Sequence, residues 1–211
     1  MSLAPRSERF FIDGPAGKLE ALLETPNDLV EPAAVAVVCH PHPQHQGTML
    51  NKVAHTLSRS FVQLGAPALR FNFRGVGRSE GEFADAVGEV DDAIAAMDFL
   101  RSRWPQAALW LGGFSFGAQV SLAAAQQRDV KWLVTIAPPV ERMKLAEFRI
   151  PECPWLLVQG GADEVVDPRG VADWAKSLEP APAFEWLPGV GHFFHGHLNE
   201  LREIIIRHAP Q

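Results

Sequence analysis

The chain contains short, uninterrupted hydrophobic runs that alternate with longer segments of mixed polarity. Each run is rich in Val, Leu, Ile or Ala and has the length of one β-strand that is buried on both faces. Because such strands need helices over both faces of their sheet, the pattern predicts a mostly parallel sheet between two helical layers. The predicted strands are residues 33–39, 66–73, 107–111, 131–137 and 154–159.

The segments between these runs have hydrophobic residues at the spacing of one helix face. Near the C-terminus, Phe184–Pro188 predicts a last strand, and Leu198–His208 predicts a closing helix from its i, i+3, i+4 pattern. Strands and helices in alternation are typical of a doubly wound α/β fold. The other predicted helices are Met49–Leu64, Val87–Leu100, Ala118–Gln127 and Val171–Leu178.

Two regions depart from this alternation. Phe10–Ile12 and Leu19–Leu23 flank a turn-rich spacer, which predicts an antiparallel hairpin at the N-terminus. Between Ala137 and Pro154 lie only about sixteen residues, which is enough for a short helix at Lys144–Phe148 and too few for a cap domain.

Length and composition predict a single domain. A chain of 211 residues that is 47% hydrophobic can bury one sizeable core, so we expect residues 1–211 to form one α/β domain. The formal net charge is −6 and the basic residues are dispersed. This distribution lacks the basic patch that a nucleic-acid partner requires.

The sequence also indicates where the protein resides. The N-terminal segment lacks the apolar stretch of a secretory signal, and no later run approaches the roughly 20 residues that span a bilayer. We therefore expect a cytoplasmic protein without a membrane span. The two cysteines, Cys39 and Cys153, lie beside predicted strands, where buried free thiols are expected and a disulfide is the alternative.

The segment Gly113-Phe114-Ser115-Phe116-Gly117 lies at the corner between a predicted strand and the helix after it. Glycines two residues before and after the serine remove the Cβ atoms that would clash in so sharp a turn, and the turn pushes the hydroxyl outward. An exposed serine becomes a nucleophile only with a nearby base and a third group that orients the base. The sequence therefore predicts Ser115 as a catalytic nucleophile.

A catalytic carboxylate is expected beyond the carboxyl end of a strand, where the sites of open α/β sheets are built. Asp163 follows the predicted strand 154–159 through Gly-Gly-Ala, and we predict it as the acid. The alternatives are Glu164 and Asp167. We expect Glu164 to point away along the loop, and Asp167, which precedes Pro168, to begin a helix.

The base is predicted by the same rule. His192 follows the last predicted strand through Pro-Gly-Val-Gly, which gives it a tight loop at a strand end. The alternatives are His195 and His197, which we expect to lie later, in the terminal helix. A surface imidazole that only hydrogen-bonds its neighbours is the other interpretation of His192.

Acyl transfer also needs N–H donors for the developing oxyanion. One is the backbone amide of the residue after the nucleophile, Phe116. The second should come from the loop after an earlier strand, where His42 alone, between Pro41 and Pro43, has a backbone N–H. We predict the His42 amide, with Gln44 as the alternative.

Four pieces of this chain resemble motifs of the α/β-hydrolase superfamily, and the chain order of nucleophile, acid and base matches it too. Within that superfamily the chain is most similar to small capless serine hydrolases near the dienelactone hydrolase group. His40–Pro43 resembles the H-G-x-P oxyanion loop, Arg74–Ser79 the R-G-x-G-x-S turn, Gly113–Gly117 the nucleophile elbow, and residues 160–166 with Gly191-His192 the acid and base loops.

The chain departs from this pattern at two positions. Dienelactone hydrolases use a cysteine nucleophile where this chain has Ser115, so their lactone chemistry is not implied. Pro41 stands where the oxyanion loop usually has glycine. The motif therefore predicts the location of that loop but not its conformation.

Together these residues predict a serine hydrolase that cleaves carboxylic esters or thioesters through an acyl-enzyme, without a cofactor or metal. The expected substrate is a small-molecule or acyl-carrier ester. Two other classes stay open. One is a non-catalytic binding module on a hydrolase fold. The other is a metal-dependent hydrolase that uses His40, His42 and His45, whose spacing matches the H-x-H-x-D-H motif of metallo-β-lactamases with Gln44 in place of the aspartate.

Overall fold

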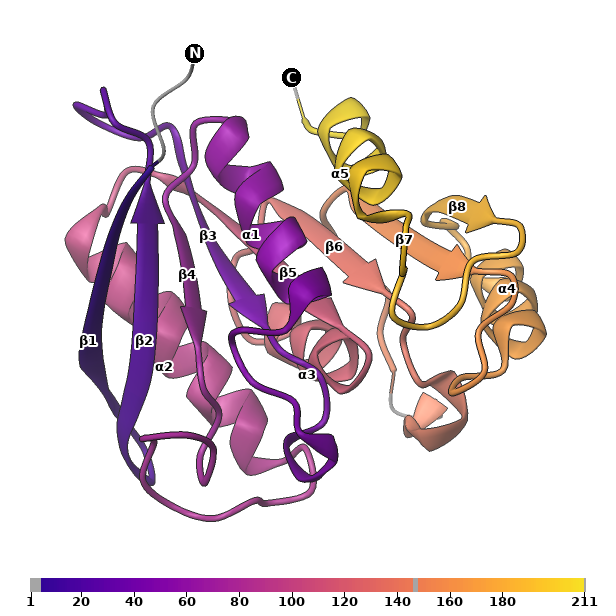
Figure 1. Cartoon of the computed structure of the whole chain (residues 1–211), viewed down its shortest axis with the longest axis horizontal. Coiled ribbons are helices and arrows are strands. Elements are labelled where there is room, and N and C mark those ends of the chain that lie inside the picture. Colours follow the sequence, from indigo (N-terminus) through magenta and orange to yellow (C-terminus); the bar gives the residue numbers. More distant parts are fainter. Residues whose placement is uncertain (1–4, 146–147, 211) are drawn as a thin grey trace.

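The structure, a computed structural model, describes residues 5–145 and 148–210. Its strands are β1 (Arg6–Gly14), β2 (Gly17–Thr25), β3 (Ala34–Cys39), β4 (Ala68–Phe71), β5 (Ala108–Phe114), β6 (Trp132–Ile136), β7 (Trp155–Gly160) and β8 (Ala183–Leu187). Within the described residues these strands form one sheet in the order β1-β2-β4-β3-β5-β6-β7-β8 (Figure 1). From β4 to β8 neighbouring strands are parallel, whereas β2 is antiparallel to both β1 and β4. The predicted mostly parallel sheet with an N-terminal hairpin is confirmed.

Helices cover both faces of the sheet (Figure 1). They are α1 (Lys52–Gln63), α2 (Gly88–Arg103), α3 (Phe116–Ala125), α4 (Pro168–Ser177) and α5 (Leu198–Arg207), with short 3-10 helices η1 (Pro43–His45) and η2 (Val140–Arg142). The buried side chains of α1 and α5 pack on one face, and those of α2, α3 and α4 pack on the other. This is the doubly wound arrangement that the alternating pattern predicts.

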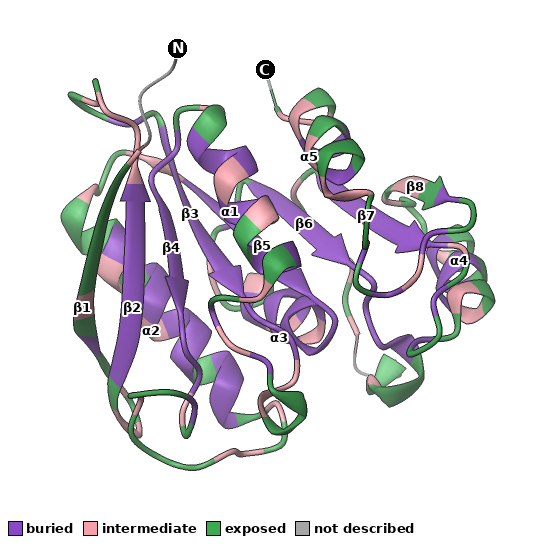
Figure 2. Ribbon diagram, viewed as in Figure 1, coloured by how far each residue is buried: buried purple, intermediate pink, exposed green. Residues whose placement is uncertain are grey.

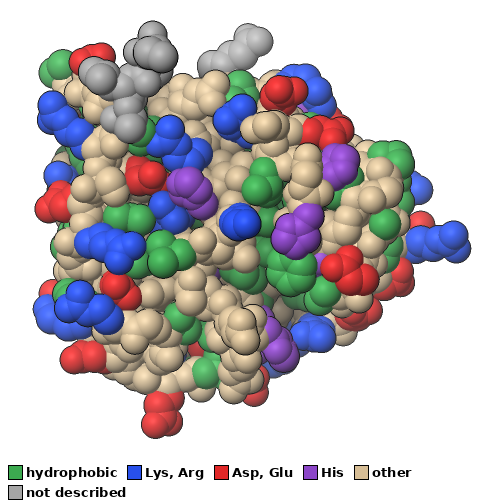
Figure 3. Space-filling model, viewed as in Figure 1, with side chains coloured by type: hydrophobic (Ala, Val, Ile, Leu, Met, Phe, Trp, Pro, Cys, Tyr) green, Lys and Arg blue, Asp and Glu red, His purple; other side chains and the backbone are tan. Residues whose placement is uncertain are grey.

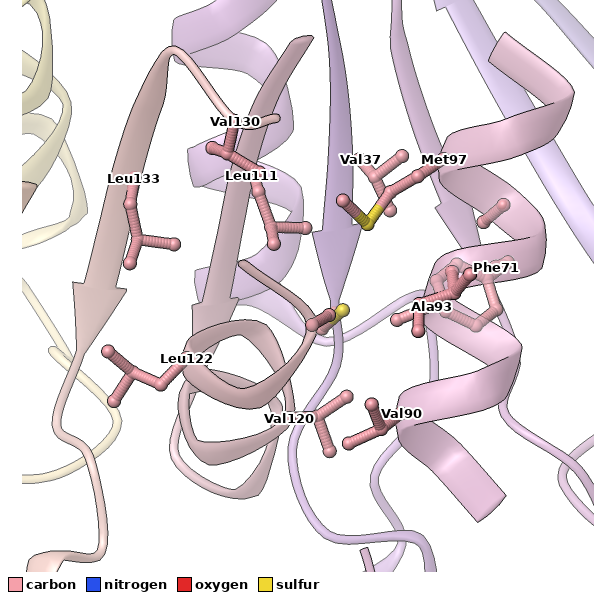
Figure 4. Close-up of a cluster of buried hydrophobic side chains, with 14 of the residues drawn as sticks. Val37, Phe71, Val90, Ala93, Met97, Leu111, Val120, Leu122, Val130 and Leu133 are labelled. Carbon is pink, nitrogen blue, oxygen red and sulfur yellow. The ribbon is translucent and has the colours of Figure 1, made fainter. Parts of the chain in front are cut away.

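The sheet separates two hydrophobic cores, and its central strands are buried on both faces (Figure 2). On the side of α2 and α3, Met97 packs near Val37 and Leu111 (Figure 4). On the side of α1 and α5, Phe61 and Ile205 are fully buried. Burial of each large side chain stabilises the fold by roughly 1.5–3 kcal/mol, so the two cores hold the strand ends in fixed positions.

Several predicted boundaries move by a few residues, for identifiable reasons. α1 begins three residues after the predicted start because Asn51 is its N-cap, with Oδ1 accepting the N–H groups of Val53 and Ala54. α4 begins at Pro168, before the predicted start, because Asp167 caps it. Part of the short helix predicted at residues 144–148 lies outside the described residues, and η2 precedes it.

Both cysteines are free, as expected for the first of two alternatives. Cys39 is fully buried, and burial raises the pKa of its thiol to about 12. Cys153 is half-buried, and burial raises its pKa as well. Among the described residues, no helix combines the length and the apolar character that crossing a membrane requires.

Candidate active site

The strands β3, β5, β7 and β8 end at the same edge of the sheet, and the loops that follow them meet there (Figure 1). Because the sheet is parallel in this region, the carboxyl ends of these strands bring residues from distant parts of the sequence together. The loop after β5 carries Ser115, the loop after β7 carries Asp163, and the loop after β8 carries His192.

Ser115 occupies a strained backbone conformation between β5 and α3, with φ 56° and ψ −121°. A positive φ is unfavourable for a residue with a side chain, so the surrounding structure must hold this turn in place. The flanking glycines make that possible. A Cβ atom on Gly113 would lie 2.1 Å from the carbonyl oxygen of Gly117, and one on Gly117 would lie 2.3 Å from that of Cys39.

The three side chains lie in one hydrogen-bonded row. His192 Nε2 is 3.1 Å from Ser115 Oγ, and His192 Nδ1 is 2.8 Å from Asp163 Oδ2. All three residues are buried, with 9%, 2% and 9% exposure for Ser115, His192 and Asp163. The structure therefore brings together the three residues that the sequence predicts, with an imidazole placed between a hydroxyl and a carboxylate.

The Asp163 carboxylate accepts four hydrogen bonds. Its Oδ1 accepts from the N–H groups of Val165 and Val166 at 2.9 and 2.8 Å, and its Oδ2 accepts from His192 and from Gln159 Nε2, the latter at 3.0 Å. Burial alone would raise the pKa of this carboxyl, but the hydrogen bonds from His192 and the backbone outweigh burial and hold the pKa below its usual value. The group is thereby kept as a carboxylate.

Glu164 does not point away along the loop, so that expectation is wrong. Its Oε2 accepts the backbone N–H of His192 at 3.1 Å, and this contact ties the acid loop to the base loop. The reason lies in Gly191, which has no side chain at the point where the Glu164 carboxylate approaches. Asp167 caps α4 by accepting the N–H of Arg169, as expected.

Gln159 is a residue of this site that sequence reasoning missed. It is fully buried near the end of β7, and its amide donates to Asp163 as well as to the Gly160 carbonyl. The signal was a polar side chain in a strand that is otherwise apolar, because a buried amide needs partners and the nearest ones lie beyond the strand end.

The prediction that His195 and His197 lie in the terminal helix is wrong, because both precede α5. His197 is the residue at the N-terminus of α5, and its ring pairs with Glu200 at 2.9 Å. His195 is exposed, and its ring centroid lies 6.0 Å from that of the exposed Phe193. Figure 3 shows histidine and hydrophobic side chains side by side on this face. Among the described residues, neither histidine is hydrogen-bonded to Ser115 or Asp163.

His42 and Phe116 line the same pocket as Ser115. Phe116 begins α3 directly after Ser115, and the ring of His42 packs on that of Phe116 with centroids 4.9 Å apart. Among the described residues, neither amide has a protein acceptor. The alternative donor Gln44 is already engaged, because its N–H donates to His42 Nδ1 at 3.2 Å.

His40 uses both ring nitrogens inside the protein. Its Nδ1 lies 2.6 Å from the Pro41 carbonyl, and its Nε2 accepts the N–H of Phe73 at 3.1 Å. Complete burial lowers the pKa of this imidazole to about 4. With both nitrogens occupied, His40 has no lone pair to offer a metal. No cluster of at least three His, Cys, Asp or Glu suited to a metal ion occurs in the described ranges.

A pocket of about 970 Å³ opens beside Ser115 and His192. Its walls come from the segments after β3, β4, β5, β6, β7 and β8, so six separate segments shape it. Apolar side chains form much of the lining: Phe83, Ala86, Val87, Phe116, Pro139, Val165, Val166 and Phe193. A cavity of this size and composition suits a small organic molecule or the end of a larger one.

Comparisons with known proteins agree with this fold. The family model described as "Serine aminopeptidase, S33" matches residues 30–151. An uncharacterised protein of Rickettsia prowazekii is 34% identical over 210 residues, covering 93% of this chain and 86% of the relative. The structure of an α/β serine hydrolase homologue from Coxiella burnetii is 42% identical with a TM-score of 0.92, covering 96% of this chain and 97% of the other. An α/β serine hydrolase without a lid from Xanthomonas campestris is 40% identical with a TM-score of 0.91, covering 96% and 93%.

Proposed function

The chain belongs to the α/β hydrolases, in the family described as serine aminopeptidase S33, and from this membership we propose a specific activity. We propose that it cleaves carboxylic esters or thioesters through an acyl-enzyme on Ser115. The observation that carries the proposal is the row from Ser115 Oγ through His192 to Asp163, with separations of 3.1 and 2.8 Å. Such a row is the arrangement that converts a weak serine hydroxyl into a nucleophile.

In the first half-reaction, Ser115 Oγ attacks the carbonyl carbon of the ester while His192 Nε2 takes the serine proton. The tetrahedral intermediate collapses when His192 returns that proton to the leaving alcohol or thiol, which leaves an acyl group on Ser115. In the second half-reaction, His192 takes a proton from water, the hydroxide attacks the acyl carbonyl, and Ser115 is released with its proton restored.

Asp163 fixes the imidazole in the orientation this sequence needs. Its carboxylate accepts from His192 Nδ1, so Nε2 faces the serine, and its negative charge stabilises the imidazolium that forms. The two N–H groups of the Val165–Val166 turn and the Gln159 amide hold the carboxylate itself. The lowered pKa of Asp163 supports this role, because the charged form is the one required.

The developing oxyanion is assigned to the amides of His42 and Phe116. Donors that are already in place when charge develops lower the barrier without reorganisation. The fit is supported by two features: both residues line the pocket beside Ser115, and both amides are without a protein acceptor among the described residues. The imidazole of His42 packs against Phe83 and Phe116 and takes part in no step of the proposed reaction.

A fluorophosphonate probe tests the proposal, because it labels only an activated serine. We expect the purified protein to be labelled equally with and without a chelator, and Ser115→Ala to abolish labelling. Ser102→Ala, at an exposed serine on α2, is the matched control and should be labelled like the wild type. Chelator-sensitive hydrolysis without labelling would favour a metal-dependent enzyme, and neither labelling nor hydrolysis would favour a binding role.

Ester hydrolysis by His192→Ala gives a second test. We expect kcat to fall by several orders of magnitude, since nucleophile and base act as a unit. The matched control is His195→Ala, which removes an exposed imidazole three residues away. Near-normal turnover by His192→Ala, or an equal loss in His195→Ala, would refute the assignment of the base.

A further inference from the structure

Two cationic side chains line the pocket that contains Ser115. Arg142 is the last residue of η2, Lys144 follows two positions later, and both are exposed. No carboxylate among the described residues lies within ion-pair distance of either side chain. By contrast, Arg70 and Arg74 elsewhere in the chain are paired with buried carboxylates at 2.9 and 2.7 Å. Arg142 and Lys144 are therefore free to bind an anion from solution.

The charge of Arg142 reaches the proposed oxyanion loop. The pKa of His42 is lowered, first by burial and then by the nearby charges of His45 and Arg142. The His42 ring in turn packs on Phe116, the residue next to Ser115. Arg142 thus lines the same pocket of about 970 Å³ as Ser115 and His192, and one substrate molecule in that pocket can contact all three.

The remaining lining combines apolar side chains with uncharged polar ones and a single carboxylate. Of the described lining residues, Asp85 alone is a carboxylate, and it lies in the loop before α2. The chain as a whole has a net charge of −6, so its overall field repels anions. A cationic rim on a pocket of such a protein offers a local attraction that the rest of the surface does not.

We infer that the preferred substrate of this pocket is an ester or thioester that carries an anionic group, bound by Arg142 and Lys144. The inference rests on the proposed hydrolase function. The apolar walls take the hydrocarbon part of the substrate, and the two cations take a carboxylate on the acyl group or a phosphate on the leaving group. Arginine and lysine both form charge-assisted hydrogen bonds with either anion, because carboxylates and phosphates both present negatively charged oxygen atoms.

The test compares charged and neutral esters with the same acyl chain length. For a carboxylate, the pair is 4-nitrophenyl hydrogen adipate and 4-nitrophenyl hexanoate. For a phosphate, the pair is hexanoyl-coenzyme A and hexanoyl-N-acetylcysteamine. The measured quantity is the ratio of kcat/KM for the charged member to that for the neutral member. Comparing this ratio between the wild type and each variant cancels the difference in intrinsic reactivity between the charged and the neutral substrate.

We expect Arg142→Gln/Lys144→Gln to lower this ratio about tenfold for at least one pair, with kcat/KM of the neutral ester unchanged. Asp85→Asn should change the ratio in the opposite direction, because it removes the competing negative charge. Lys176→Gln, at an exposed cation of α4 outside the pocket, is the matched control and should leave the ratio as it is.

The pair whose ratio falls identifies the kind of anion. If the ratio is the same in the wild type and the double variant for both pairs, the inference is overturned. In that case, hydrolysis of the neutral esters would still support the proposed function. Absence of turnover of both charged esters by protein that reacts with the fluorophosphonate also overturns it. Loss of fluorophosphonate labelling in the wild type defeats the proposed function itself, and the inference with it.

Discussion

The imidazole of His40 is enclosed between Pro41 and Phe73, and its two nitrogens have opposite roles. Nδ1 donates to the Pro41 carbonyl, while Nε2 accepts from the Phe73 backbone, so the ring must stay neutral to make both hydrogen bonds. These contacts fix the start of the loop that carries His42 to the chain beyond β4. His40 therefore has a structural role next to the site, and the pKa of its imidazole affects the free energy of unfolding.

This term gives the fold a specific acid sensitivity. Burial lowers the pKa of His40 from 6.5 to about 4, so between these pH values the unfolded chain binds a proton there that the folded chain does not. Stability then falls as pH falls, by about 1.4 kcal/mol per pH unit from this residue and by about 3 kcal/mol in total. Urea unfolding from pH 7 to pH 4 should show a shallower dependence for His40→Gln than for the wild type. Parallel curves would show that His40 is protonated in the folded state as readily as in the unfolded one.

At this scale the sequence predicts the residues that follow strand ends and misses those that support them. The sequence predicts that Ser115, Asp163 and His192 lie together because each follows a hydrophobic run, and parallel strands bring their carboxyl ends together. The partners Gln159 and Glu164 depend on side-chain directions that a linear pattern does not contain. Glu164 accepts a hydrogen bond from His192, 28 positions later in the sequence, and no local sequence rule predicts such a contact.

The nucleophile elbow, Gly113–Gly117, lies at the boundary between β5 and α3. α3 begins at Phe116, two residues before the predicted start, because the glycine at position 117 lets the first turn of the helix pack against the end of β3. The hydrophobic periodicity of the sequence predicts this helix correctly. It does not place its first residue, because the first turn is set by contact with another strand and not by the helix's own sequence.

A methyl group at the elbow should disrupt it. In Gly117→Ala the new Cβ would lie 2.3 and 2.5 Å from the carbonyl oxygens of Cys39 and His40, which are backbone atoms that cannot rotate away. We expect a loss of about 3 kcal/mol in unfolding free energy and loss of fluorophosphonate labelling. Gly170→Ala is the matched control, since its Cβ would meet the Asp167 carboxylate at 2.9 Å, which is a side-chain group and not backbone, within a helix. It should stay within about 1 kcal/mol of the wild type and keep its labelling.

At the scale of the molecule, buried polar contacts join the N-terminal hairpin to the loop of His42. Arg70 on β4 donates to Glu24 of β2 at 2.9 Å and to the Met49 carbonyl at 2.6 Å. Asn72 accepts the Met49 N–H at 2.8 Å and donates to Glu20 at 2.8 Å. Both backbone groups of Met49 are thus held, at the far end of the loop whose near end is held by His40.

The sequence predicts the hairpin and the strands but not this connection. Glu24 and Arg70 are 46 residues apart, and they meet only because β2 inserts antiparallel beside β4 at the edge of a parallel sheet. A charged residue in a hydrophobic run is visible in the sequence, and it signals that a partner must exist. Which partner it finds depends on strand order, which the pattern of hydrophobic residues leaves open.

Two variants separate the contribution of this connection to stability from its contribution to catalysis. Arg70→Met removes the buried cation that pairs with Glu24 at 2.9 Å and leaves the carboxylate with the more exposed Arg59, at 3.9 Å, so unfolding free energy should fall by about 3 kcal/mol. Glu24→Leu/Arg70→Met removes both charges and should recover most of that loss. Both variants lack the hydrogen bond to the Met49 carbonyl, which holds the far end of the proposed oxyanion loop.

Urea unfolding and ester hydrolysis measured on the same samples decide between the two roles. If Arg70 positions the loop, kcat should remain reduced about tenfold in the double variant although its stability has returned, because a small displacement of the His42 amide weakens its contact with the oxyanion. Arg128→Met is the control, since it removes an exposed ion pair with Asp98 and should change stability by less than about 1 kcal/mol with kcat unaltered. Recovery of kcat together with stability in the double variant would show that the connection serves the fold alone.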